Sequence, residues 1–262
     1  MLSSPTFKTM KSIFVVLIVP VLMAGCVQLK SEEKSKQPLS TNAVADEVLP
    51  FSSSTVTGIT QQWAPLIIHP GKKRTKYQLV SDNGKRVLHA YAAQASSGLL
   101  QKVSIDPIKQ PALSWRWRIG GLVASADNHD RALEDAPARV ILAFDGDKDK
   151  LPFADQILFE TARVMTGHDF PYATLMYIRG RQAPVGSIIP NARSNRIKMI
   201  VVASGPAGVG EWHHFSRDIV ADYERAFGEK PGKLVGVGVL TDTDNTGETV
   251  EAWYDDIQLA PR

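Results

Sequence analysis

The densest group of side chains that could do chemistry lies near the C-terminus, in the run Asp242-Thr-Asp244-Asn245-Thr-Gly-Glu248. Oxygen-bearing side chains at alternate positions, followed by a glycine, match the first half of a calcium-binding loop. The twelfth position is Trp253 rather than the bidentate glutamate of an EF-hand, and strand-like patterns flank the run. Two interpretations therefore stay open: a hairpin loop whose side chains bond to its own backbone, or a surface site for a cation or a sugar.

A second polar group begins at Asp127-Asn-His-Asp-Arg131 and continues through Glu134-Asp135 to Arg139. It could hold an acid–base pair or form a salt-bridged loop between two strands, and we favour the loop. Together with the first group it defines our candidates for ligand contact: Asp127, Arg131, Asp135, Arg139, Trp212, Asp242, Asp244, Asn245 and Glu248.

Catalytic signatures are otherwise missing from the sequence. None of the histidines has metal-ligand spacing, and the adjacent His213 and His214 would face opposite sides of a strand. There is no G-x-S-x-G elbow, and the glycine-rich run 205–210 lacks the order of a nucleotide loop. A glycan hydrolase would need two carboxyls about 5–9.5 Å apart, for which the candidates are Asp127, Asp135, Asp242 and Asp244. We expect no resident cofactor beyond a possible structural calcium.

The N-terminus resembles a lipoprotein export signal. Lys8 and Lys11 precede the apolar segment Ile13–Leu22, which is too short to span a bilayer as a helix. The following Leu-Met-Ala-Gly-Cys26 is similar to a bacterial lipobox and contains the only cysteine; the alternative is a buried free cysteine beside a soluble signal peptide. We predict a signal peptide over 1–25 and lipidation of Cys26. The resemblance places the protein in the bacterial cell envelope, on the outer membrane and facing the periplasm.

Charge excludes one class of partner. The formal net charge is +3, and residues 1–25 contribute two lysines and no acid, so the rest of the chain is nearly neutral. A nearly neutral surface does not bind nucleic acid through its phosphates. Residues 26–50 are polar, without an apolar period, and we predict a flexible tether there, followed by one domain over 51–262.

The candidate residues need a framework, and the dominant apolar period is two. Leu113, Trp115, Trp117 and Ile119 alternate with polar residues, as in a strand with one buried face. Two helices are expected, over Phe153–Met165 and Asp218–Phe227. Glycines at 236 and 238 predict close approach of a packed side chain. The pattern favours a mainly β fold, an antiparallel β-sandwich of the jelly-roll or galactose-binding-like kind. Further strands are expected over 86–93, 99–105, 139–144, 172–178, 197–203, 234–240 and 250–259.

Several segments resemble a bacterial family known as domain of unknown function 3047. They are Leu113–Arg118, Ala126–Asn128, Asp135–Val140, Pro184–Ser187, Pro190–Asn191, Gly238–Glu248 and Ala252–Ile257. The resemblance spans roughly Phe51–Leu259 and implies an exported protein without an assigned activity.

A weaker resemblance links Trp253–Leu259 to the closing strand of jelly-roll carbohydrate-binding modules. In those modules an aspartate often holds a structural calcium, which adds Asp256 to Asp242 and Asp244 as candidate metal ligands.

We therefore expect a lipid-anchored β-sandwich that binds a glycan or another envelope component without catalysis, through polar groups beside Trp212 and Trp253. For Trp253, packing in the core is the stronger expectation. The rival functions are a polysaccharide lyase or hydrolase on the same fold, and an envelope assembly or scaffold lipoprotein. The sequence identifies no protein partner.

Overall fold

The structure, a computed structural model, describes residues 44–54, 59–166, 169–192 and 194–262. The chain separates into two units, Met1–Leu39 and Ser40–Arg262, and only the second is described below. The expected signal peptide, Cys26 and most of the expected tether lie outside the described residues. Among the described residues there is no helix both long and apolar enough to cross a membrane.

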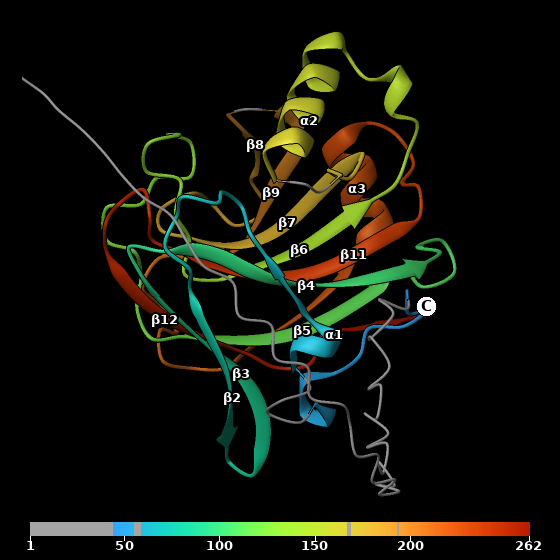
Figure 1. Ribbon diagram of the computed structural model, residues 1–262. Coiled ribbons are helices and arrows are strands. Elements are labelled where there is room, and N and C mark those ends of the chain that lie inside the picture. The colour runs from blue at the N-terminus through green and yellow to red at the C-terminus, as the bar shows by residue number, and fades with distance from the viewer. Residues whose placement is uncertain (1–43, 55–58, 167–168, 193) are drawn as a thin grey trace, which may run out of the picture. The chain divides into compact units, whose positions relative to one another are not determined.

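Two β-sheets face each other across the main core (Figure 1). The seven-stranded sheet has the order β1-β4-β11-β6-β7-β9-β8. The six-stranded sheet has the order β10-β5-β12-β3-β2, with β13 also paired to β5. The chain changes sheet repeatedly, at β1–β2, β3–β4, β4–β5, β5–β6, β9–β10, β10–β11 and β11–β12, as in jelly-roll sandwiches. The strand bounds are β1 Ala64–Leu66, β2 Lys76–Asp82, β3 Lys85–Ala93, β4 Ser96–Ile105, β5 Ala112–Ile119, β6 Arg139–Phe144, β7 Ala173–Gly180, β8 Ile188–Asn191, β9 Ser194–Ser204, β10 His213–Asp218, β11 Leu234–Asp242, β12 Thr249–Tyr254 and β13 Gln258–Ala260.

The predicted β-sandwich is confirmed, and the period of two explains it. In β5 every second side chain is buried, and Trp115 and Trp117 lie within the core with Tyr177 of the opposite sheet stacked on Trp115. On β11 a Cβ at Gly238 would lie 2.8 Å from the Leu99 carbonyl oxygen and 3.0 Å from the Leu100 side chain. Glycine is needed there because the backbone of β4 approaches closely, in addition to the packed side chain that the sequence predicted.

Three details differ from the expected strands. The pair β7–β9 is parallel, because the chain reaches the sheet edge as β8 before returning as β9 between β8 and β7. The expected strand over 250–259 is two strands, β12 and β13, which residues 255–257 separate. The strands β1, β2 and β8 were not predicted, and β2 shows no clear alternation.

Both predicted helices are present, as α2 (Phe153–Thr166) and α3 (Ile219–Phe227), along with the short α1 (Ile59–Gln62) and the 3-10 turns Phe51–Ser53 and Lys148–Lys150. The carboxylate of Asp218 accepts hydrogen bonds from the first turn of α3, and Gly228 ends that helix at a φ of 74°. Tyr223 of α3 packs on Phe144, which closes one part of the core.

The folded unit makes contacts within the range expected to be tether. The backbone of Ala45 bonds to Lys102 and Ser104 of β4, and the amide of Leu49 donates to Gln101 Oε1 at 2.9 Å. Val48 packs against the core. A few apolar residues in this polar stretch are enough to order it against the domain, because part of β4 is otherwise unpaired on that side.

Candidate functional site

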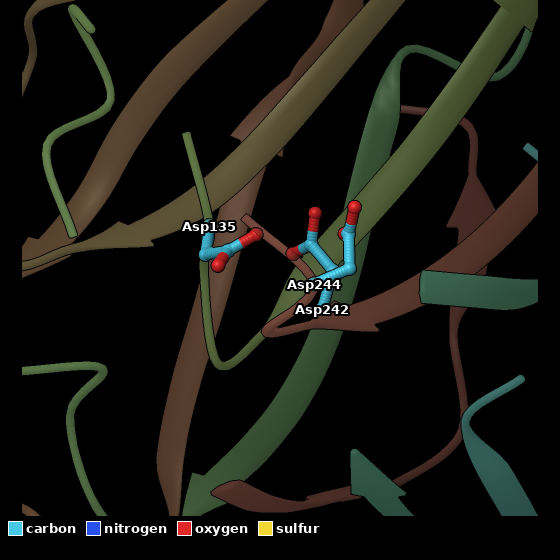
Figure 2. Close-up of side chains that lie close together, drawn as sticks. All are labelled: Asp135, Asp242 and Asp244. Atoms are coloured by element: carbon cyan, nitrogen blue, oxygen red, sulfur yellow. The ribbon is translucent and has the colours of Figure 1, made fainter. Parts of the chain in front are cut away.

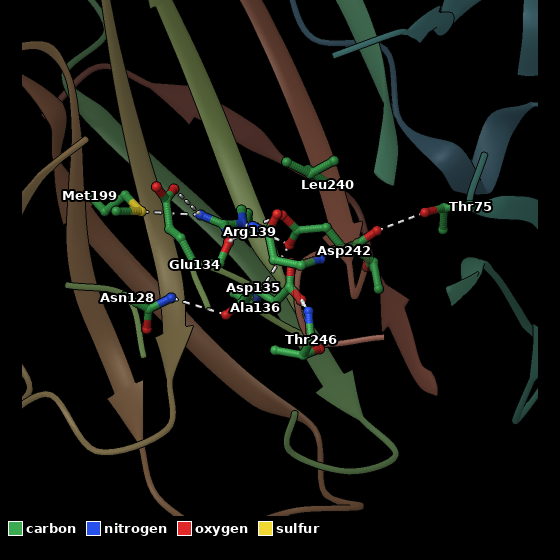
Figure 3. Close-up of polar contacts among 12 residues, drawn as sticks. Thr75, Asn128, Glu134, Asp135, Ala136, Arg139, Met199, Leu240, Asp242 and Thr246 are labelled. Carbon is green, nitrogen blue, oxygen red and sulfur yellow. Dashed lines mark hydrogen bonds and ion pairs between the residues drawn. The ribbon is translucent and has the colours of Figure 1, made fainter. Parts of the chain in front are cut away.

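Arg139, the first residue of β6, is the centre of a buried polar network (Figure 3). Its side chain is 1% exposed, and its Nε and Nη2 donate to the two carboxylate oxygens of Asp242 at 3.0 and 3.1 Å. Nη2 also donates to the backbone carbonyl of Glu134, whose carboxylate lies 3.6 Å from Nη1. A bidentate carboxylate and a second acid fully compensate this buried guanidinium.

Asp135 joins the network to the loop after β11. Its Oδ2 accepts from the amide and the hydroxyl of Thr246, both at 2.8 Å, and Oδ1 accepts from the amide of Asn245. Its own carbonyl accepts from Asn128 Nδ2 at 3.0 Å. The two polar groups singled out in the sequence are therefore halves of one structure, held face to face by side-chain-to-backbone bonds.

Three carboxylates converge here, those of Asp135, Asp242 and Asp244 (Figure 2). One oxygen from each lies within 4.8 Å of the others, which is the arrangement of a hard-cation site. Each carboxylate already has protein partners, however, since Asp244 forms an ion pair with Lys72 and Asp242 with Arg139. The residues could hold a divalent cation only in competition with two basic side chains.

The pKa of Asp242 is raised to about 6, chiefly by burial and to a smaller extent by the neighbouring Asp135, although Arg139 acts in the opposite direction. The same acids raise the pKa of Arg139 despite its burial. The raised pKa of Asp242 is what a general acid would need, but this carboxyl is buried behind Arg139.

The other candidates lie elsewhere. Asp256 accepts from the amide and hydroxyl of Ser52 and lies 3.4 Å from Lys85, and it is not among the three converging carboxylates. Glu248 bonds to the amides of Ala124 and Ser125, which ties the loop to a different segment.

Asp127 and Arg131 are both exposed. Asp127 Oδ1 accepts from the amide of His129 at 3.0 Å, which is the bonding of a local turn. Residues 127–131 therefore form a loop rather than an acid–base pair. Neither the Asp127 nor the Arg131 side chain bonds to the Arg139 network.

A row of aromatic and polar side chains crosses the outer face of the six-stranded sheet. Two of its members, Trp212 and Trp253, were singled out in the sequence, but the row was not. Register places Gln78 of β2 opposite His89 of β3, His89 opposite Trp253 of β12, and Trp253 opposite Arg118 of β5. Trp212, in the segment before β10, completes the row beyond Arg118. We call these five residues the transverse row.

Members of the transverse row touch one another. His89 stacks on Trp253 with ring centroids 4.9 Å apart, and the Arg118 guanidinium lies 4.5 Å from the Trp253 ring and 5.2 Å from the Trp212 ring. Asp82 holds the Trp212 end of the row in place. Its carboxylate accepts from Trp212 Nε1 at 2.7 Å and lies 3.5 Å from Arg118. The row is a preorganised, half-exposed surface.

Part of this row could have been found from the sequence. Alternation in β5 already assigned Arg118 to the outer face. Trp253 was expected in the core, but Ala252 and Tyr254 occupy the inner positions of β12 and leave the tryptophan outside. Which residue of another strand lies beside it depends on register between segments far apart in the chain, which periodicity does not encode.

Comparison with protein families gives one match. The model described as "Protein of unknown function (DUF3047)" matches residues 61–258. This range contains both the Arg139 network and the transverse row. No protein of curated function matches the chain.

Several solved structures are similar at low identity. The family 30 carbohydrate-binding module of a Clostridium thermocellum cellulase is 10% identical, with 84% of this chain and 95% of that chain covered and a TM-score of 0.36. A cellulose-specific carbohydrate-binding module, CBM28, is 13% identical, with 83% and 94% covered and a TM-score of 0.37. The xyloglucanase domain of the Sinorhizobium fredii effector NopAA is 6% identical, with 76% and 91% covered and a TM-score of 0.40.

Proposed function

The chain belongs to the DUF3047 family, whose description names no activity, and we propose that it binds a glycan on the outer face of the six-stranded sheet without catalysing a reaction. The transverse row is the observation that carries this proposal. Aromatic rings beside hydrogen-bonding groups are the chemistry that sugars require, since one sugar face is apolar and its edge is polar.

The shape of the row favours a chain-like ligand over a small molecule. It crosses four strands, which at a strand spacing of about 4.8 Å is a length of about 15 Å. The bond from Trp212 to Asp82 and the stacking of His89 on Trp253 fix the rings before a ligand arrives. Rings that are already ordered lose little conformational entropy on binding.

Hydrolysis is the rival function, and the observation in its favour is the group of Asp135, Asp242 and Asp244 with a raised pKa at Asp242. We give these residues a structural role instead. Asp135 and Asp242 are both buried. The carboxylate of Asp135 accepts from Thr246, and that of Asp242 accepts from Ala136 and Arg139. A carboxyl that must protonate a glycosidic oxygen has to reach the ligand.

Lipid attachment at Cys26 and a place on the outer membrane are the remaining parts of the proposal. The supporting feature is the signal-like sequence that ends in the only cysteine. Cys26→Ser should abolish labelling by a radioactive fatty acid, because no other thiol is present. Label that persists in the variant would contradict lipidation, and fractionation of the labelled protein would test the outer-membrane assignment.

Binding is tested with a panel of soluble polysaccharides, measured by affinity electrophoresis and then by calorimetry on the strongest hit. Trp253→Ala should weaken binding at least tenfold, a loss of about 1.4 kcal/mol. Arg118→Gln, which keeps a hydrogen-bonding side chain, should weaken it less. Tyr172→Ala is the matched control, since Tyr172 is a half-buried ring that packs against Arg196 outside the row.

The outcomes separate the hypotheses. Equal affinities for wild type and both row variants would overturn the row as the site, and an absence of binding across the panel would overturn glycan binding. Release of reducing ends from the same samples would support the hydrolase instead.

A further inference from the structure

Arg179, near the end of β7, is a second buried guanidinium, and it has no acidic partner in the part of the chain that the structure describes. The residue is 1% exposed. Its Nη2 donates to the carbonyls of Gly205 and Ala207 at 2.7 and 2.6 Å, and its Nε is buried without a hydrogen-bond partner among the described residues. Burial lowers the pKa of Arg179, and no carboxylate opposes that effect.

A cation in this position is unusual, because an ionised group taken out of water is costly unless an opposite charge compensates it. Neutral carbonyl groups supply only part of that compensation. The side fork of the guanidinium, formed by Nε and Nη2, is the geometry that pairs with the two oxygens of a carboxylate or a sulfate. One of those two donors is unpaired, and the other is occupied only by loop carbonyls.

The loop of residues 205–210 contacts the Arg179 guanidinium through two carbonyls. Pro206 and Ala207 of this loop are exposed, although the Ala207 carbonyl accepts from the guanidinium. The loop turns at Gly205, Gly208 and Gly210, which have φ values of 70°, 71° and 86°. It is anchored at its ends, where Gly205 bonds to Gly180 and Gly210 bonds to Ile119. Its middle is held to Arg179 through the Ala207 carbonyl, while the Gly208 carbonyl lies 2.8 Å from His213 Nε2 and Val209 packs against the core, so Pro206 and Ala207 are the part that can move.

We propose that Arg179 is the binding group of a second site, which takes an oxyanion, the carboxylate or sulfate group of an acidic sugar, in place of the Ala207 carbonyl. The exposed middle of the loop moves aside, and the anion pairs with Nε and Nη2. Arg179 is on the seven-stranded sheet and is not a member of the transverse row, although the loop that contacts it leads to Trp212. This site goes beyond the proposed function because it concerns a charged group rather than a glycan chain.

The test uses the full-length protein and three probes: sodium glucuronate, sodium sulfate, and glucose as the neutral control, all at one ionic strength. Melting temperature and calorimetry report binding. Glucuronate or sulfate should raise the melting temperature of the wild type, and glucose should not. Arg179→Met should lose the response, and Arg179→Lys should keep a weaker one with at least a fivefold lower affinity. Arg74→Met, at an exposed arginine before β2, should respond as the wild type does.

The two anions identify the group that binds: a response to glucuronate assigns a carboxylate, and a response to sulfate alone assigns a sulfate ester. An equal response in wild type and Arg179→Met, or no response of the wild type to either anion, would overturn the site and leave Arg179 as an anchor of the loop. Glycan binding through the row stands or falls separately, because it is measured on Trp253→Ala with polysaccharides.

Discussion

Arg139 and Arg179, on neighbouring strands, expose the same small fraction of their surface, yet their surroundings are opposite. Both are 1% exposed, and the backbone of Arg179 bonds to the residue before Arg139. Arg139 has Asp242 and Glu134 as ionic partners, and these acids raise its pKa. Arg179 has two carbonyls and no acid, and burial lowers its pKa.

The difference separates two uses of a buried charge. The Arg139 network joins the segment 134–139 to the loop 242–248, so its charges are balanced within the chain and its role is to hold two loops together. The positive charge of Arg179 has no acidic partner among the described residues. We interpret a buried charge that is paired within the chain as structural, and an unpaired buried charge as a group that binds a ligand.

Arg139→Met should produce the largest loss of stability. It leaves the carboxyls of Asp242 and Asp135 buried without their cation, and removal of one partner from a buried pair typically costs about 3–5 kcal/mol. Urea denaturation measures the loss. The double variant Arg139→Met/Asp242→Leu should recover much of it, and a double variant less stable than the single one would contradict the structural role of the pair.

The second largest effect should be a dependence of the unfolding free energy on pH, caused by the raised pKa of Asp242. Its pKa is about 6 in the folded protein, above its ordinary value of 3.8, so the folded state holds this proton more tightly than the unfolded state does. The contribution of Asp242 is therefore fully present below about pH 4 and is lost as the pH rises through about 6, by roughly 1–3 kcal/mol.

Asp242→Asn isolates this contribution, because the amide does not titrate. The difference in unfolding free energy between wild type and Asp242→Asn should change between pH 4 and pH 7. The unfolding free energy of the wild type should fall relative to that of the variant as the pH rises. A constant difference across that range would mean that Asp242 is ionised throughout and that its pKa is not raised.

Thr246→Val should cost about 1 kcal/mol, since it removes one hydroxyl bond to Asp135 and leaves the amide bond in place. Thr249→Val, at an exposed position on β12, is the control and should change stability by less than about 0.5 kcal/mol. Equal effects at the two positions would show that Asp135 does not hold the loop through this hydroxyl.

Arg179→Met should be nearly neutral for stability, within about 1 kcal/mol, because the lost carbonyl bonds are offset by removal of an uncompensated charge. The matched pair of Met variants, at 139 and 179, tests the comparison directly. A loss at 179 as large as that at 139 would mean that Arg179 is compensated after all.

Calcium should have the smallest effect. Lys72 and Arg139 already pair with the converging carboxylates, so the melting temperature should stay flat across millimolar calcium and after addition of a chelator. A site filled at 100 times its dissociation constant would stabilise the fold by about 2.7 kcal/mol, and a rise of that size would restore the calcium interpretation of Asp242 and Asp244.

How far the sequence leads depends on whether a feature is local. The alternation of Trp115 and Trp117, the cap at Asp218 and the turn at Gly228 are local, and the sandwich and both helices were predicted from such signals. The polar groups around Asp135 and Asp242 were recognised as two segments, and their union was not, because it requires the loop after β11 to meet the start of β6. Arg179 gave no signal at all, since an arginine at the end of an apolar strand is usually solvated.

The most direct test of glycan binding is a titration of the strongest polysaccharide from the panel into wild type and Trp253→Ala, followed by calorimetry. We predict a saturable isotherm for the wild type and at least a tenfold weaker one for the variant, with Tyr172→Ala unchanged. Identical isotherms for wild type and Trp253→Ala, from two proteins of the same fold by circular dichroism, would contradict the transverse row as the binding surface.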